Sequence, residues 1–133
     1  MTHADVQDWL DRYVRAWETY DESDVRALFS GDAEYRYHPW DEPERGLDTI
    51  VDAWINPSGP ASGRDEPGTW TARYEPWIVE GDRAVAIGET AYFTDASRTT
   101  EARHYWNIWQ LEFGPDGRCR SFVEWFMQRK KAS

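Results

Sequence analysis

The chain has 133 residues and a formal net charge of −10 at pH 7. Its length suits a single domain over residues 1–133 that buries its own core. The excess of negative charge would repel phosphate groups, which argues against a nucleic-acid partner. The sequence has no N-terminal basic segment followed by an apolar run, and no apolar stretch of membrane-spanning length. We therefore expect a cytoplasmic protein with no membrane partner.

The first half of the chain is predicted to be mainly helical. Apolar residues spaced three or four positions apart predict a helix over residues 6–20. A second, shorter helix follows, with Asp21 as its N-cap, and residues 30–32 (Ser-Gly-Asp) would end it. Residues 34–38 alternate aromatic and polar side chains before Pro39, which predicts a short edge strand. A third helix is predicted over residues 48–55.

The second half of the chain is predicted to be a sheet. Residues 56–68 are rich in glycine and proline and are predicted to form a loop. Four long strands are then predicted, separated by turn signals, at residues 69–79, 83–94, 101–113 and 118–128. Helices followed by a meander of antiparallel strands indicate an α+β domain.

Aromatic residues are the most unusual feature of the composition. The chain contains nine Trp, seven Tyr and five Phe residues, which make up 16% of the sequence. Such side chains combine a large apolar body with a hydrogen-bonding edge, so they suit cavity walls and subunit interfaces. We expect an aromatic-lined cavity, with a core filled by its own aromatic side chains as the alternative.

The strand predicted at residues 101–113 is apolar on both faces. Tyr105, Asn107 and Trp109 lie on one face, and Trp106 and Ile108 lie on the other. An antiparallel sheet with one face in water should alternate more cleanly between apolar and polar residues. We therefore expect a second copy of the chain to cover the outer face in a two-fold homodimer, with Trp106 near the centre.

The order of these elements resembles the nuclear-transport-factor-two-like superfamily, and within it the SnoaL-like domain proteins. Local cues are the Ala-Leu-Phe-Ser-Gly-Asp-Ala run at residues 27–33, Arg-Gly at 45–46 and Gly-Asp at 81–82. The resemblance covers nearly the whole chain. It implies a cone-shaped, cystatin-like fold, in which three N-terminal helices pack on a curved antiparallel sheet and leave a pocket, and it implies no cofactor. The superfamily contains enzymes and binding proteins, so the fold alone does not decide function.

A distant resemblance to ketosteroid isomerase suggests which residues could be catalytic. That enzyme needs a general base and two donors to an oxyanion. Tyr13 falls at the position of its oxyanion tyrosine. His38 falls at the position of its base in one alignment, and Tyr37 does in another. Trp109 stands where the isomerase has its second oxyanion donor, an acid, which is a departure from the enzyme's pattern.

Glu124 is a further candidate, because aromatic residues flank it on the last predicted strand and would raise its pKa. It could form an acid–base pair with His38, or an ion pair with an arginine of a neighbouring strand. The three histidines lack the spacing of a metal site, so we expect no metal. We expect one cavity to contain the catalytic candidates His38, Tyr13 and Glu124, and the ligand-binding candidates Trp17, Tyr37, Trp54, Asn107, Trp109 and Phe122.

Three functions agree with this pattern. The first is a small-molecule-binding SnoaL-like protein whose cavity takes a hydrophobic ligand, with or without turnover. The second, an alternative to binding alone, is a cofactor-independent isomerase, cyclase or hydratase, with His38 as general base and Tyr13 as oxyanion donor. The third is a structural dimer whose own side chains fill the pocket. A cavity that holds His38 and a second titratable group would favour the enzyme, and an apolar cavity without that pair would favour the binding protein.

Overall fold

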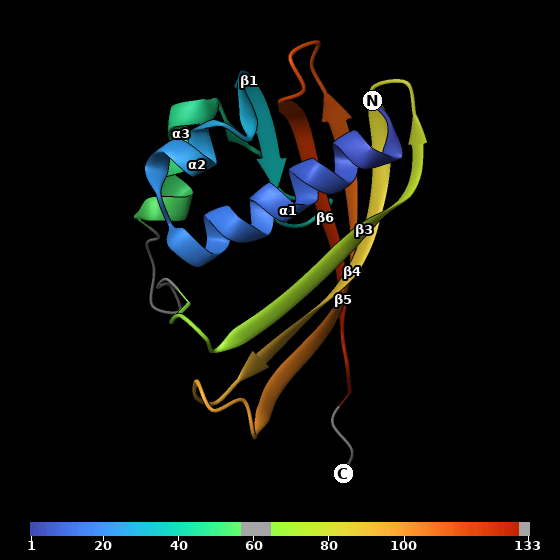
Figure 1. Ribbon diagram of the computed structural model, residues 1–133. Helices are drawn as coiled ribbons and strands as arrows, with labels where there is room; N and C mark the ends of the chain where they lie inside the picture. Colours follow the sequence, from blue (N-terminus) through green and yellow to red (C-terminus); the bar gives the residue numbers. More distant parts are fainter. Residues whose placement is uncertain (57–64, 131–133) are drawn as a thin grey trace.

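The computed structural model describes residues 1–56 and 65–130, so residues 57–64 of the predicted loop lie outside the described part. Figure 1 shows that the long helix α1 lies across one face of a twisted sheet, with the shorter helices α2 and α3 beside its C-terminal end. The elements in chain order are α1 (His3–Thr19), α2 (Glu22–Arg26), β1 (Phe29–Arg36), β2 (Glu44–Arg45), α3 (Leu47–Ile55), β3 (Trp70–Glu80), β4 (Arg83–Phe93), β5 (Glu101–Phe113) and β6 (Cys119–Gln128).

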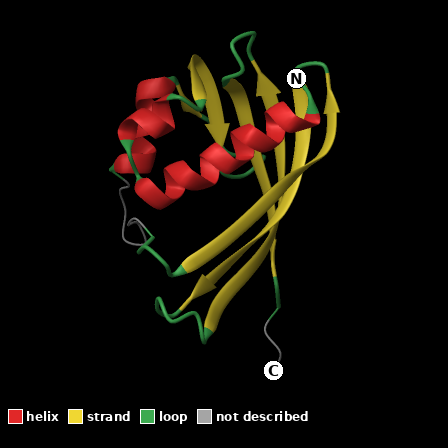
Figure 2. Ribbon diagram, in the orientation of Figure 1, coloured by secondary structure: helices red, strands yellow, loops and turns green. Residues whose placement is uncertain are grey.

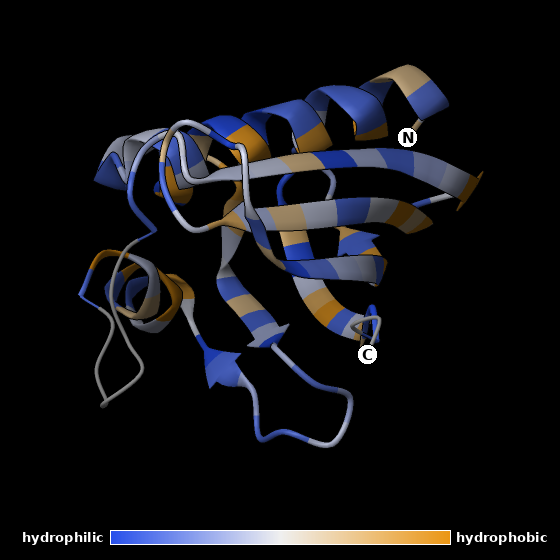
Figure 3. Ribbon diagram, turned by 90° about the horizontal axis from the view of Figure 1, so that it is seen from below, coloured by the Kyte–Doolittle hydropathy of each residue, from blue (hydrophilic) through white to orange (hydrophobic). Residues whose placement is uncertain are grey.

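Helix α1 begins at a capping box and buries one face. The Thr2 hydroxyl accepts from the Asp5 backbone N–H, and the Asp5 carboxylate accepts from the Thr2 backbone N–H, which satisfies two donors at the helix start. Figure 3 shows the hydrophobic residues of α1 on the side toward the sheet. The buried residues of α1 keep the predicted spacing: Val6, Trp9, Leu10, Tyr13 and Ala16.

No helix in residues 1–56 and 65–130 is long and apolar enough to span a membrane.

The sheet has six strands in the order β2-β1-β6-β5-β4-β3. Strands β3 to β6 form the predicted antiparallel meander. The expectation of a wholly antiparallel sheet is wrong, because β1 pairs with β6 in parallel, with Tyr35 opposite Phe122. This pairing joins strands that are far apart in the chain, so no local sequence signal sets its direction. The three predicted helices are present, but only α1 is long (Figure 2).

Strand β1 is longer than predicted and is not the edge of the sheet. It begins at Phe29, so the Ser-Gly-Asp sequence at residues 30–32 lies at the start of a strand rather than after a helix. The register against β6 shifts between Phe29 and Glu34, which accommodates these turn-forming residues within the strand. The edge position belongs to β2, a two-residue strand that was not predicted.

The core lies between the helices and one face of the sheet, here called the inner face. Trp9 is fully buried at its centre, where its ring makes edge contacts with Phe29 and Phe113. Its indole N–H donates to the Leu28 carbonyl oxygen at 2.9 Å, which satisfies the one polar atom of the ring. Trp109 is 2% exposed on this face, as the alternation of β5 predicts. The opposite face of the sheet is here called the outer face.

Candidate functional site

The helices leave a cavity of about 350 Å³ against the inner face of the sheet, here called the inner cavity. Helices α1 and α3 contribute Tyr13, Trp17 and Trp54. Strands β4, β5 and β6 contribute side chains from alternate positions, and β3 contributes Tyr74. Most of the lining residues are aromatic, so the walls are large, flat and apolar. Strands β4 and β5 extend beyond the helices at the end of the sheet where a loop connects β4 to β5 (Figure 1). Arg103 lines the cavity near this end of β5 and is exposed, so we refer to this end of the cavity as its mouth.

A row of hydrogen bonds crosses four strands on the inner face. The Tyr74 hydroxyl on β3 pairs with the Thr90 hydroxyl on β4. Thr90 donates to the Asn107 side-chain oxygen on β5 at 3.1 Å, so the proton between Tyr74 and Thr90 comes from Tyr74. The Asn107 amide then donates to Glu124 Oε2 on β6 at 3.1 Å. Every donor in the row therefore points toward the carboxyl group of Glu124.

Glu124 is held by two N–H donors in an otherwise apolar wall. The Trp109 indole N–H donates to its Oε2 at 2.6 Å, beside the bond from Asn107. Within the described part of the chain, no hydrogen bond reaches Oε1, so this oxygen is available to a bound molecule. Glu124 lines both the inner cavity and a second hollow described below. Burial raises the pKa of Glu124 above its ordinary value, while the two N–H donors and the charge of His38 oppose that rise. The site therefore presents a carboxyl group that can hold or release a proton nearer to neutral pH.

Two tyrosine hydroxyls face the inner cavity from the other side. Tyr13 on α1 and Tyr35 on β1 form a hydrogen bond of 2.6 Å between their hydroxyl oxygens. One of them donates to the other, so one O–H proton remains for a further acceptor. Burial raises the pKa of Tyr13 and of Tyr35, so both hydroxyls stay protonated at neutral pH. The pair can donate a hydrogen bond to an oxygen atom of a bound molecule.

Seven of the nine residues expected at the site line the inner cavity: Tyr13, Trp17, Tyr37, Trp54, Asn107, Trp109 and Glu124. Phe122 does not line it. It is fully buried behind the wall, where its ring stacks on Tyr35 at 4.2 Å and on Tyr13 at 5.6 Å. Phe122 thus supports the two tyrosines rather than touching a ligand.

The structure corrects the expected place of His38. Strand β1 ends at Arg36, two residues earlier than predicted, and His38 lies beyond this end, outside the lining of the inner cavity. Its Nδ1 atom is 2.8 Å from a carboxylate oxygen of Asp41, and its ring stacks on Trp40. His38 does share the lining of a second hollow with Glu124 and Asn107. Among the described residues no hydrogen bond joins His38 to Glu124, so the structure does not show the acid–base pair as a direct contact.

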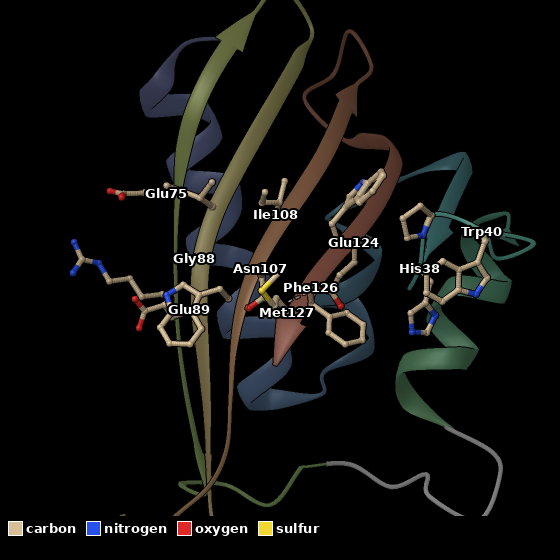
Figure 4. A pocket seen from close by; sticks show the side chains of 15 residues that line it. His38, Trp40, Glu75, Gly88, Glu89, Asn107, Ile108, Glu124, Phe126 and Met127 are labelled. Carbon is tan, nitrogen blue, oxygen red and sulfur yellow. Dashed lines mark hydrogen bonds between the residues drawn. The ribbon is translucent and has the colours of Figure 1, made fainter. Parts of the chain in front are cut away.

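A second, larger hollow is lined mainly by residues of the outer face of the sheet, together with Asn107 and Glu124, which also line the inner cavity. It has a volume of about 1150 Å³, and we call it the outer depression. Figure 4 shows it from outside, with Ile108 on its floor and His38 and Trp40 at the side beyond β6. Trp106 and Trp125 also line it and are 44% and 48% exposed. The apolar outer face that the sequence predicts is thus present.

The mouth of the inner cavity includes residues that the sequence analysis did not select. The Trp17 indole N–H donates to Asp65 at 2.8 Å. Tyr92 and Arg103 lie near them on adjacent strands, with the guanidinium 4.4 Å from the Tyr92 ring centroid. Period-two alternation from Asn107 back along β5 places Arg103 on the inner face, so this signal could have found it. Among the described residues, no cluster of three His, Cys, Asp or Glu side chains could hold a metal ion.

Comparison with known proteins places the chain in a family. The model of the SnoaL-like domain matches residues 10–122, and the chain therefore belongs to the SnoaL-like domain family. The resemblance drawn from the order of elements is confirmed. No curated protein matches the sequence significantly.

Solved structures with the same fold have very different sequences. A LEH-like epoxide hydrolase from M. tuberculosis is 13% identical, with a TM-score of 0.64 over 94% of this chain and 84% of that chain. A protein from Kribbella flavida DSM 17836 with a provisional ketosteroid isomerase name is 12% identical. Its TM-score is 0.66 over 98% of this chain and 84% of that chain. A protein from Sphaerobacter thermophilus is 19% identical, with a TM-score of 0.62 over 92% of this chain and 95% of that chain. These matches show a shared fold.

Proposed function

We propose that this protein binds a small, flat, hydrophobic molecule in the inner cavity, with a polar end that donates a hydrogen bond to Glu124. The observation that carries this proposal is an aromatic-lined cavity that includes the Glu124 carboxyl group, on which the described residues leave one oxygen atom without a hydrogen bond. Ligand pockets span about 300–1,000 Å³. A cavity of about 350 Å³ lies at the small end of that range, which favours a molecule of one or two rings.

Calorimetric titration with two matched probes tests this proposal. Naphthalene and 2-naphthol share the same rings and differ by one hydroxyl group, which can donate to Glu124 Oε1. We expect 2-naphthol to bind the wild type about tenfold more tightly, since a hydrogen bond to a charged acceptor contributes roughly 1.5–3 kcal/mol. The substitution Glu124→Gln should remove most of this advantage.

Glu75→Gln is the matched control, because Glu75 lies on β3 and lines the outer depression instead of the inner cavity. It should leave the ratio of the two affinities unchanged. Equal binding of both probes to the wild type would contradict the role of Glu124. Binding of neither probe would contradict the proposed function as a whole.

The second candidate function is a cofactor-independent isomerase, cyclase or hydratase. It is favoured by one observation, that a carboxyl group with a raised pKa and a neutral tyrosine pair face the same cavity. Because His38 lies outside this cavity, Glu124 takes its place as the base in this scheme. Glu124 would accept a proton from a carbon next to a carbonyl group, and Tyr13 or Tyr35 would donate to the oxygen that becomes negative. The proton would then return to a carbon of the same molecule.

Proton exchange in 2-tetralone tests this second candidate. This two-ring ketone has acidic protons at C1, and their replacement by deuterium in D₂O is followed by NMR. Catalysis predicts exchange faster than in buffer alone, lost in Glu124→Gln and retained in His38→Ala. An exchange rate equal to that of buffer would leave binding as the function. Loss of exchange in His38→Ala would restore His38 as the base.

We also propose a homodimer through the outer face. The apolar side chains of Trp106, Ile108 and Trp125 are each between 44% and 48% exposed in the single chain. Contiguous apolar surface of this kind is rarely left open on soluble monomers. A two-fold partner would bury it while the mouth of the inner cavity stays accessible.

A further inference from the structure

Arg103 is the one basic residue among the described residues that line the inner cavity. It lies on the inner face of β5 at the mouth. Its guanidinium lies 4.4 Å from the centroid of the Tyr92 ring, and one of its N–H groups donates to the Tyr105 hydroxyl at 3.2 Å. The described residues give it no ion-pair partner, so most of its N–H donors remain available to a ligand.

Arg103 and Glu124 lie toward opposite ends of the inner cavity. Glu124 is hydrogen-bonded to Asn107, which lies four residues after Arg103 on the same strand. Strand residues rise by about 3.3 Å each, so the Arg103 and Asn107 backbones are about 13 Å apart. The aromatic walls run between these two positions. This length suits a two-ring molecule with one polar group at each end.

The local charge at the mouth differs from the charge of the whole chain. The net charge of −10 would repel an anion at long range. Asp65 is the acidic residue beside the mouth, and its carboxylate accepts a hydrogen bond from Trp17. A guanidinium group presents a planar fork of donors that matches a carboxylate, and its contact with the Tyr92 ring helps to hold that plane. An anion therefore has one favourable position at the mouth.

We infer that the ligand is a flat aromatic hydroxy acid, with its carboxylate bound by Arg103 and its hydroxyl group bound by Glu124. This inference rests on the proposed function and adds a second polar group, the carboxylate, to the proposed ligand. It makes Arg103 the residue that selects acids over neutral molecules of the same shape.

Calorimetric titration with 2-naphthol and 6-hydroxy-2-naphthoate tests the inference, because the two probes differ only by the carboxylate. We expect the acid to bind the wild type about tenfold more tightly. Arg103→Gln should bring the ratio of the two affinities to about one or below, and Arg103→Lys should restore part of it. Raising the salt concentration should weaken the acid more than 2-naphthol. Arg73→Gln on β3, which lines the outer depression, is the control and should leave the ratio unchanged.

The outcomes separate this inference from the proposed function. If 2-naphthol binds and the acid binds no more tightly, the inference is overturned and the proposed function stands. The same holds if the acid is favoured equally by the wild type and by a folded Arg103→Gln variant, as checked by its thermal unfolding midpoint. If neither probe binds the wild type, the proposed function fails and the inference fails with it.

Discussion

Among single residues, Glu124 combines the properties that a binding or proton-transfer group needs. Its Oε2 atom accepts hydrogen bonds from the N–H groups of Trp109 and Asn107. The residues that the structure describes give its Oε1 atom no hydrogen bond, and we propose that a ligand binds there. Fixing one oxygen sets the direction of the other without help from the ligand, which lowers the entropic cost of binding. His38 is a useful contrast, since it pairs with Asp41 and lines the outer depression rather than the inner cavity.

The raised pKa of Glu124 predicts a specific dependence of stability on pH. Between the ordinary value of 4.5 and the raised pKa, the folded protein holds a proton that the unfolded chain has released. The free energy of unfolding therefore falls as pH rises through this window. Glu124→Gln should show a smaller fall than the wild type there, measured by urea unfolding at a series of pH values. Parallel curves for the two proteins would mean that the pKa of Glu124 is not raised.

Among the secondary-structure elements, β3 and β4 approach so closely that Gly88 has no room for a side chain. A Cβ atom there would overlap the Arg73 carbonyl oxygen and the Tyr74 ring. The Tyr74 ring in turn stacks on Trp109, with 4.0 Å between their centroids. The glycine thus lets an aromatic wall residue of the inner cavity lie flat against the sheet.

Gly88→Ala should lower the free energy of unfolding by about 3 kcal/mol, because backbone and a packed ring would have to move. Gly31→Ala is the matched control, since a Cβ atom at Gly31 meets nothing within 4 Å. It should change stability by less than about 1 kcal/mol. Chemical unfolding of both variants gives the comparison, and equal effects would show that the sheet yields at Gly88.

For the whole molecule, we propose that the outer depression is the surface on which a second chain packs. Trp106 lies in the lining of this hollow, so a charge at its position should oppose burial against a second chain. We expect the wild type to sediment as a dimer at micromolar concentration and Trp106→Asp to sediment as a monomer. Trp77→Asp is the control, because Trp77 is 69% exposed and does not line the outer depression. A wild-type monomer, or equal behaviour of the two variants, would contradict the homodimer.

Much of the fold could be predicted from the sequence, because helix and strand periodicity are local. The strand at Glu101–Phe113 has the predicted bounds, and its alternation correctly places Trp109 toward the helices and Trp106 on the outer face. The same rule brought Glu124 and Asn107 into one cavity with Tyr13 of α1. Turn-forming residues at 30–32 misled the prediction of β1, since pairing with β6 overrides their local preference.

The family, the order of the long elements and seven of the residues that line the inner cavity could be predicted from the chain alone, because they follow from local spacing and from the order of the elements. Three points depend on tertiary packing. These are the parallel pairing of β1 with β6, the exclusion of His38 from the inner cavity, and the row of donors that ends at Glu124. Each depends on contacts between residues far apart in the chain, whose geometry is set by packing rather than by local backbone preference.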